Sequence, residues 1–394
     1  MDRLETTGYY ALGIPLIGAV LAYEVWRARQ SVSFAEAISN LSAGLGTLII
    51  GIFVGPGVYF LWDFAYRNFG LFDFGAHWWR WPVALLVSDL CYYIHHRSGH
   101  TFAFLWAIHG VHHQHDYQNS TVGLRLEWLA DLSTVTFFSV MPLLGFDPYT
   151  GFVTVSLLSA YTLTTHAPAL SIPGFGILVN AASHGAHHSR DARYSGFNFG
   201  AMFTFWDRLF GTYKPHDLAQ EFKFDVPTVS RMHCGVAAQF SLMSELMQDV
   251  GRAPTWKERW RLLTRGPGQD GRDGTAVLRD ESTLSSAARF YLTCDFLATV
   301  VFSTWLLWVR SDNALIVRVL GSVFVIWSLR AQGGLLDDRP NAVRETAYRW
   351  AFALATAAVL STRLPAVSAA LAAAALVGLG SLLAIRGRLI AAAA

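Results

Sequence analysis

Histidine is distributed very unevenly along this chain. Eleven of its fourteen histidines lie between His95 and His188, and most of them form short clusters. One cluster has the spacing HxxxH, two have the spacing HxxHH, and one histidine stands alone; in chain order these nine are His96, His100, His109, His112, His113, His166, His184, His187 and His188. Residues three and four positions apart share one face of an α-helix. The spacing therefore predicts that the members of each cluster point the same way.

Nine such imidazoles indicate a dinuclear metal site. Neutral imidazole is the commonest protein metal ligand and suits Zn, Cu, Fe and Ni. A tetrahedral zinc site takes at most four protein ligands, so nine candidates are too many for one ion and suit two. If they were unrelated polar residues, burying so many without a metal or hydrogen-bond partners would be costly. The chain lacks the paired Glu-x-x-His pattern of soluble di-iron carboxylate bundles. We interpret the site as di-iron with imidazole ligands.

The other histidines are expected to lie outside the metal site. His95 is one step off the helical face shared by His96 and His100, so it should not be a ligand. His115 lies two positions beyond His113, about 200° around a helix, and is predicted to support a ligand instead. Ordinary surface positions are expected for His77, His216 and His233.

Composition points to the lipid bilayer. Hydrophobic residues make up 53% of the 394, charged residues 15%, and the mean hydropathy is +0.33. The net charge of +2 gives no case for nucleic acid. The three cysteines are far apart and suggest neither a metal site nor a disulfide framework. The N-terminal residues lack the basic region and cleavage site of a signal peptide.

The first hundred residues contain three apolar runs, at 9–26, 41–62 and 78–94, each long enough to cross a membrane. Gly55-Pro56-Gly57 predicts a kink in the second run, and 63–77 is expected to be a loop. Arg27 and Arg29 follow the first run and place that end in the cytoplasm by the positive-inside rule. Counting crossings puts the histidines on the cytoplasmic side as well.

The remaining chain alternates between polar and apolar segments. Residues 101–131 are too charged for a span, whereas 132–165 predict a helical hairpin with a turn near Gly145 that returns His166 to the inner side. Residues 254–283 predict an exposed loop or short surface helices, of which TWKERWRLLTR suits either an acidic membrane surface or an ordinary solvated helix. Four apolar runs follow, and only the first and last are comfortably long: 287–309, 315–328, 347–362 and 366–385.

These segments predict an all-α fold, a polytopic membrane helical bundle with a cytoplasmic, histidine-rich di-metal cap. We expect four parts in chain order: N-terminal transmembrane helices at 1–95, a di-iron core at 96–215 that includes the transmembrane hairpin 132–165, a polar cytoplasmic segment at 216–286, and C-terminal transmembrane helices at 287–394.

The motifs resemble those of the fatty acid hydroxylase (sterol desaturase) superfamily. The resemblance rests on Asp89-x-x-Tyr92-Tyr93-x-x-His96-Arg97-x-x-His100, the two HxxHH clusters, the lone histidine between them, and Asn198-Phe199-Gly200. Within the superfamily the chain is most similar to the alkylglycerol monooxygenases, through Asp116-Tyr117-x-Asn119-Ser120-Thr121 and the stretch 206–212 (WDRLFGT). It departs from their usual pattern at Thr101, at Gln114-His115 and at Leu126-Glu127-Trp128.

The resemblance implies an integral membrane, di-iron, O2-dependent enzyme that hydroxylates a lipid C–H, with cleavage of ether lipids at the O-alkyl bond as one outcome. It also implies an external electron donor, either tetrahydrobiopterin or a redox partner protein. Fatty acyl or sterol hydroxylation or desaturation is the alternative within the superfamily. A non-redox membrane zinc protein and a lipid-binding scaffold are the alternatives outside it.

Ligand histidines usually donate their second ring N–H to an acceptor that orients them. The acids that could do so are Asp89, Asp116, Glu127, Asp131 and Asp191, of which Asp191 is expected to be an ordinary surface or capping acid. Further polar contacts in or near the site are expected from Arg97, His115, Asn119, Arg125 and Asn198. Arg97 is also placed to hold a carbonyl or a lipid phosphate. No cofactor-binding residues are predicted.

Overall fold

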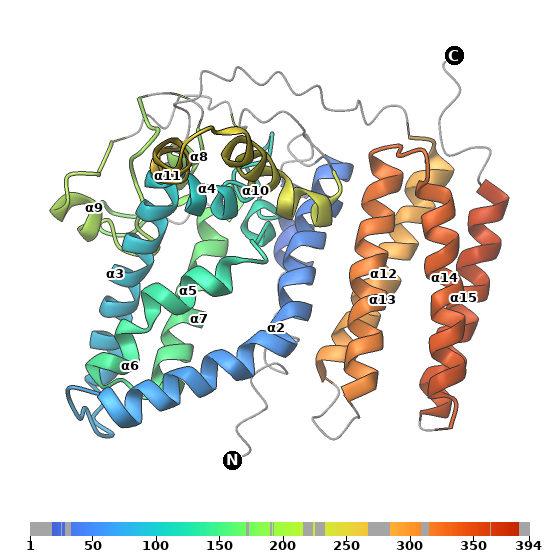
Figure 1. Ribbon diagram of the computed structural model, residues 1–394, viewed down its shortest axis with the longest axis horizontal. Coiled ribbons are helices and arrows are strands. Elements are labelled where there is room, and N and C mark those ends of the chain that lie inside the picture. Colours follow the sequence, from blue (N-terminus) through green and yellow to red (C-terminus); the bar gives the residue numbers. More distant parts are fainter. Residues whose placement is uncertain are drawn as a thin grey trace.

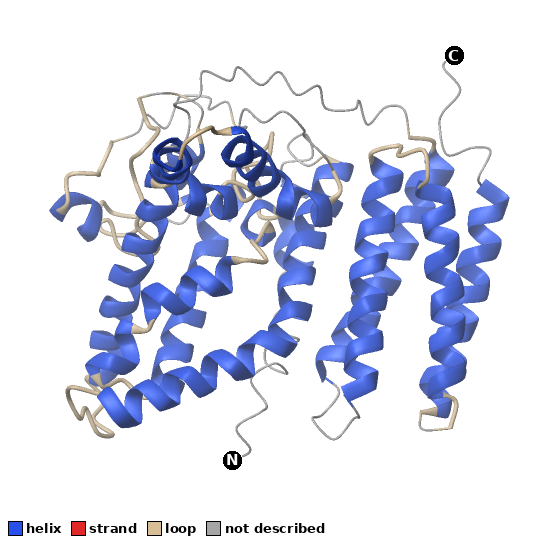
Figure 2. Ribbon diagram, in the orientation of Figure 1, coloured by secondary structure: helices blue, strands red, loops and turns tan. Residues whose placement is uncertain are grey.

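The computed structural model describes residues 18–24, 26–27, 33–170, 173–189, 191, 193–215, 224, 233–266, 284–308, 315–362 and 364–385. Within these ranges the regular elements are helices, as Figure 2 shows, and an isolated antiparallel bridge joins Leu178 and Phe203. The predicted all-α class is therefore confirmed. The predicted first span, 9–26, falls mostly outside the described residues.

Two groups of helices stand side by side in the molecule (Figure 1). The N-terminal group contains α2 (Phe34–Phe69), α3 (Arg80–Thr101), α5 (Ala130–Phe138), α6 (Val140–Leu144) and α7 (Pro148–Thr165). The C-terminal group contains α12 (Ser286–Trp308), α13 (Leu315–Leu336), α14 (Ala342–Leu360) and α15 (Pro365–Ile385). Residues of α2, α12 and α13 share one hydrophobic core, so the two groups pack together.

Shorter elements form a cap over one end of the N-terminal group (Figure 1). They are α4 (Ala103–His109), α8 (Ala181–His188), α9 (Phe205–Leu209), α10 (Gly235–Arg252) and α11 (Trp256–Thr264), with the 3-10 turns η1 (Val122–Leu124) and η2 (Pro168–Leu170). The helix α11 confirms that part of 254–283 forms a short surface helix. The side chain of Asn180 accepts from Ser183 N–H in a capping box, which fixes where α8 begins.

Helix α2 runs further than its sequence predicts. Ser33 caps its first turn by accepting from Glu36 N–H, and the helix then continues through Pro56 to Phe69. The expected loop at 63–77 is therefore wrong for its first seven residues. Proline lacks only one backbone donor, and neighbouring turns of a long helix tolerate its loss by bending. Figure 1 shows such a change of direction along α2.

The expected hairpin at 132–165 is present as three helices. Helices α5 and α6 run outward and α7 returns, and Gly145 makes the turn with a φ of 104° that few other residues tolerate. Asp147 caps α7 by accepting from Thr150 N–H, and Pro148 occupies the first helical position. The hairpin brings the chain back to the cap at His166. That it crosses a membrane stays a prediction.

Four of the described helices are long and apolar enough to cross a membrane: α2, α12, α13 and α15. Helix α13 reaches Leu336, so the expectation that the run at 315–328 is short is wrong. Its continuation holds Arg330 and Gln332, which lower the apolar character read from the sequence. Four such helices are consistent with an integral membrane protein.

Candidate metal centre

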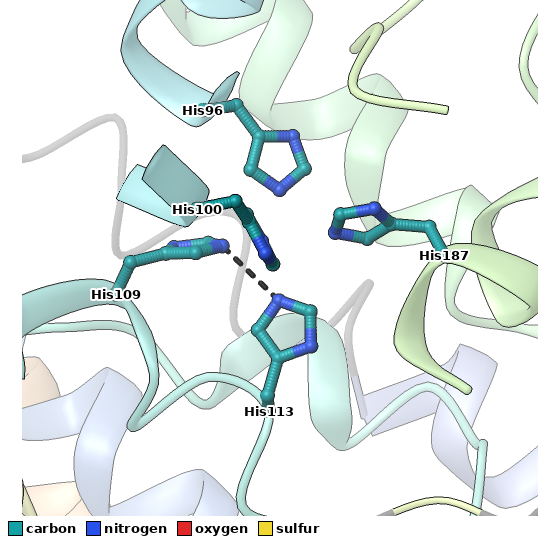
Figure 3. Close-up of side chains that lie close together, drawn as sticks. All are labelled: His96, His100, His109, His113 and His187. Atoms are coloured by element: carbon teal, nitrogen blue, oxygen red, sulfur yellow. Dashed lines mark hydrogen bonds between the residues drawn. The ribbon is translucent and has the colours of Figure 1, made fainter. Parts of the chain in front are cut away.

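All nine predicted ligands come together in two groups, to which α3, the end of α7 and the cap contribute. Group one contains His96, His100, His109, His113 and His187. Group two contains His112, His166, His184 and His188. In each group the candidate ligand atoms lie within 4.8 Å of one another. Figure 3 shows the rings of group one pointing toward a common centre.

The two HxxHH clusters are each divided between the groups. His109 and His113 serve group one, while His112 between them serves group two. In the third cluster His184 and His188 serve group two, and His187 serves group one. The expectation that all members of a triplet point the same way is therefore wrong. A shift of one residue rotates the side chain by about 100° on a helix, so one HxxHH cluster can bridge two metal positions.

The ring nitrogens fit metal ions better than they fit one another. His112 Nε2 and His166 Nε2 lie 3.1 Å apart, and His184 Nε2 lies 2.9 Å from His166 Nε2. The Nδ1 atoms of His112 and His166 face backbone carbonyls and so carry the protons. Both facing Nε2 atoms then present lone pairs, which repel unless a cation lies between them. Two ligands bound at about 2.0–2.1 Å to one ion have roughly this separation.

Unpartnered nitrogens in group one support the same interpretation. The Nε2 atoms of His96, His100 and His187 are buried and have no hydrogen-bond partner in the part of the chain that the structure describes. Leaving buried polar atoms unpaired is costly. His109 Nε2 and His113 Nε2 lie 3.2 Å apart, the contact dashed in Figure 3. The residues present therefore fit two metal ions.

Outer contacts orient the rings of group one. His109 Nδ1 lies 2.7 Å from a carboxylate oxygen of Glu127. His96 Nδ1 donates to the carbonyl of Phe199 at 2.9 Å, and His187 Nδ1 donates to that of Phe197 at 2.8 Å. Each contact turns the opposite nitrogen, Nε2, toward the centre of the group.

Group two is oriented in the same way. His112 Nδ1 faces the carbonyl of Arg125 at 3.3 Å, and His166 Nδ1 donates to the backbone carbonyl of Thr162 at 2.7 Å. His188 Nδ1 lies 2.9 Å from Nε2 of His115. His115 thus contacts a predicted ligand from outside the groups, in the position expected from its spacing.

Burial keeps these imidazoles in the form that binds metal. Desolvation lowers the pKa of His187 to about 3 and that of His166 to about 4. It also lowers the pKa of His112, His184 and His188 well below the ordinary value. The rings are therefore neutral at neutral pH, with lone pairs available to a metal.

Two buried carboxylates hold the backbone segment 197–203, which carries the carbonyls that face His96 and His187. Asp207 accepts from the backbone N–H groups of Phe199 and Gly200, each at 2.8 Å. Asp89 accepts from those of Met202 and Phe203 at 2.9 and 3.3 Å. Asp89, expected to hold a histidine, instead anchors this backbone. Sequence reasoning missed Asp207; its only signal was an acid within the aromatic stretch 206–212.

Asn198 and Arg125 also act on the backbone around the groups. Asn198 has a φ of 60°, and its side chain exchanges hydrogen bonds with the backbone of Lys214. The Arg125 guanidinium donates to the carbonyl of Val111 at 2.6 Å and to Asn40 Oδ1 at 2.9 Å. Arg125 therefore fastens the turn that carries His112 and His113 to helix α2.

Buried acids on the first helices support the neighbouring loop. Glu36 accepts from the backbone N–H of Asp116, and Glu24 accepts from both N–H and hydroxyl of Ser120. Asn119 accepts from Thr121 within this loop. Asp116 and Asn119 thus organise the loop through their backbone and local contacts. Neither glutamate was singled out from the sequence.

Several residues lie away from the groups. Arg97 is exposed and donates to the Tyr93 hydroxyl, and Asp191 pairs with Arg193 at the surface, as expected for that acid. His95 contacts the rings of Phe137 and Phe138 instead of the groups.

The predicted positions of the remaining histidines and of Asp131 agree only in part with the structure. His77 is exposed, as expected. His233 is buried, with its backbone N–H donating to Asp337, so the surface prediction for it is wrong. Its neighbour Cys234 packs against α13, and this contact buries the segment. His216 and the side chain of Asp131 lie outside the described residues.

Comparison with known proteins agrees with this architecture. Residues 81–212, which contain all nine histidines, match the fatty acid hydroxylase family model. The chain is 23% identical to alkylglycerol monooxygenase of Homo sapiens over 86% of its own length and 79% of that protein, and 24% identical to that of Danio rerio over 84% and 77%. It is 23% identical to ornithine lipid hydroxylase OlsE of Rhizobium tropici over 58% and 71%. No solved structure matches the chain.

The family model covers the histidine groups and the backbone segment that orients them, and the similarity to alkylglycerol monooxygenases extends over most of the chain. The relatives are named as monooxygenases and hydroxylases, which supports an oxidoreductase. Residues 81–212 match the fatty acid hydroxylase family, and the chain is similar to the alkylglycerol monooxygenases over most of its length.

Proposed function

We propose that this protein is a di-iron, O2-dependent lipid monooxygenase whose metals are held by the nine histidines of groups one and two. The observation that carries the proposal is the division of these histidines into groups of five and four with inward ring nitrogens. Bound iron would supply the activation of O2. The protein's own residues bind and orient the ions, and the buried rings exclude water from them.

An ether lipid is the preferred substrate class, because relatives over most of the chain are named alkylglycerol monooxygenases. Such a lipid would take one oxygen atom at the carbon next to the ether oxygen. The other atom would leave as water, with two electrons and two protons from an external donor. The resulting hemiacetal breaks into a fatty aldehyde and a glycerol derivative. Tetrahydrobiopterin is the donor implied by the resemblance, and a redox partner protein is the alternative.

Hydroxylation of a fatty acyl chain is a second candidate. A relative named fatty acid hydroxylase vlmA supports it, at 27% identity. We further propose that the cap faces the cytoplasm, on the basis of Arg27 and Arg29.

Metal analysis of detergent-purified protein tests the proposal first. We expect about two irons per chain, with Mössbauer spectra of iron-57-labelled protein showing coupled ferric ions. The loaded protein should consume O2 with an alkylglycerol and tetrahydrobiopterin and release fatty aldehyde. Zinc-bound protein that stays inactive after reconstitution with iron would favour the non-redox zinc alternative. Folded protein without any metal would overturn the proposal.

A further inference from the structure

Five large apolar side chains are exposed on two neighbouring segments near the candidate metal centre. We call this set the α9 surface; its five side chains are Phe175, Ile177, Phe205, Leu209 and Phe210. Phe175 is 84% exposed, Ile177 64% and Leu209 60%. Soluble surfaces rarely gather so many large apolar side chains without a partner.

Hydrogen bonds join the two segments that form this surface. Thr204 N–H donates to the carbonyl of Ile177 at 2.9 Å, and Arg208 Nη2 donates to that of Gly176 at 3.1 Å. Phe175 has a φ of 47°, which a residue with a side chain adopts only at a cost. The strained turn directs a phenylalanine outward, where water gives it no favourable contact.

The outer face of α3 shows where this surface lies relative to a bilayer. Val83, Leu86 and Ile94 are exposed along this face, and Arg97 follows one turn beyond Ile94. The Phe210 ring stacks on Tyr93 of the same helix, with ring centroids 5.2 Å apart. Figure 1 shows α9 at the outer edge of the molecule beside the upper part of α3. The α9 surface thus lies at the height where the outer face of α3 changes from apolar residues to Arg97.

Cationic side chains border the same level. The exposed guanidinium of Arg97 lies near Tyr93, and that of Arg208 lies over the Tyr213 ring at 3.9 Å. Asp207, the acid of α9, is buried and accepts from the backbone. Apolar anchors beside arginines match the headgroup–acyl boundary of a membrane, where the anchors enter the acyl region and the cations meet lipid phosphates.

We propose that the α9 surface sits in the headgroup–acyl boundary of an anionic leaflet, with Arg97 and Arg208 on lipid phosphates. The proposal does not depend on which metal is bound or which reaction occurs. The proposed position of the α9 surface would bring lipid next to the candidate metal centre. The turn at 175–177 leads into Asn180, which caps α8, and Asp207 holds the backbone that orients His96.

Depth-dependent fluorescence quenching in nanodiscs tests the position. Cys294 is exposed, so it is first replaced by C294S; Cys91 and Cys234 are buried and remain. An environment-sensitive fluorophore is then attached to F175C or L209C, with Q248C on the exposed side of α10 as the control. In discs of phosphatidylcholine and phosphatidylserine that hold one chain each, the 175 and 209 probes should be quenched by lipids with nitroxide near the headgroup and protected from iodide. The control probe at 248 should be quenched by iodide and not by the nitroxide lipids.

Iodide quenching of the 175 and 209 probes equal to that of the control would overturn the proposal. Protection that appears only in discs holding two chains would also overturn it, since a second copy would then cover the surface. The arginines are tested with R97Q and R208Q in the F175C background. Quenching by nitroxide lipids should rise with phosphatidylserine content in the parent and lose this dependence in the variants. A parent without such dependence would contradict the role of phosphate.

Discussion

Glu127 Oε1 lies 2.7 Å from His109 Nδ1, and both side chains are largely buried. The carboxylate fixes the proton of His109 on Nδ1 and leaves Nε2 for group one. The other outer contacts described above come from backbone carbonyls or from His115. Glu127 therefore brings negative charge to the edge of a site otherwise made of imidazoles, which would strengthen the metal bond of His109, a predicted ligand.

Replacing Glu127 with glutamine should weaken metal binding while preserving the fold. An amide can still accept from His109 but lacks the charge, and loss of such outer partners typically costs about 10- to 100-fold in metal affinity. Competition with a chelator measures the affinity. Glu258→Gln, at an exposed position of α11, is the matched control and should leave the affinity unchanged. Equal affinities for the Glu127 variant and the parent would contradict this role.

Alanine at one histidine of either group should lower bound metal and abolish turnover. His187→Ala removes a ligand from group one and His184→Ala removes one from group two. Metal analysis and product formation measure the effects. His77→Ala should change neither, because His77 is exposed and remote from the groups in sequence. Full metal and activity in the His187 variant would show that the ligand assignment is wrong.

Asp207→Asn should loosen the backbone that orients His96. The amide presents a donor toward N–H groups of Phe199 and Gly200, and a buried donor left unsatisfied costs about 1–3 kcal/mol. We expect a lower thermal midpoint and altered Mössbauer parameters of the iron. Asp191→Asn, at a surface pair with Arg193, should give parent values for both. A lower midpoint with unchanged spectra would mean that Asp207 only stabilises the fold.

The C-terminal helices contain a buried ion pair whose loss should be costly. Arg349 Nη1 and Asp295 Oδ1 lie 3.0 Å apart, with side chains 0% and 2% exposed. Arg349→Met leaves a buried carboxylate unpaired, which costs about 3–5 kcal/mol, whereas Arg349→Met with Asp295→Leu should restore most of the stability. Thermal unfolding in detergent measures both.

An exposed ion pair on α2 provides the comparison for Arg349. Arg67→Met breaks a pair with Asp63 in which the arginine side chain is 58% exposed, and it should lower the stability far less than Arg349→Met does, because solvent screens an exposed pair. A double variant at 349 and 295 as unstable as Arg349→Met alone would mean that packing, such as that of Arg349 on the Trp350 ring, outweighs the charge.

Local spacing was sufficient to predict the helical class and to single out the nine histidines that the structure brings into two groups. Their periodicity depends only on residues three and four positions apart, and apolar runs report burial or lipid wherever they occur. The spacing of His115 also indicated a contact with a predicted ligand, which the structure shows to be His188. Helix ends were less certain, as the extension of α2 to Phe69 shows, because tertiary packing and neighbouring turns override local signals there.

The sequence by itself determined which side chains are available and how each cluster is spaced. Only the tertiary structure decided that His112 belongs to group two while His109 and His113 belong to group one. It also decided that Asp89 and Asp207 accept hydrogen bonds from the backbone segment that orients His96. Asp89 is 113 residues from Met202, whereas Asp207 is only eight residues from Phe199 but bonds it across a non-helical stretch. A buried carboxylate accepts from whichever N–H groups the packed chain brings to it. Which residues meet is fixed by how the hairpin, α3 and α8 pack together, and no local pattern in the sequence contains that information.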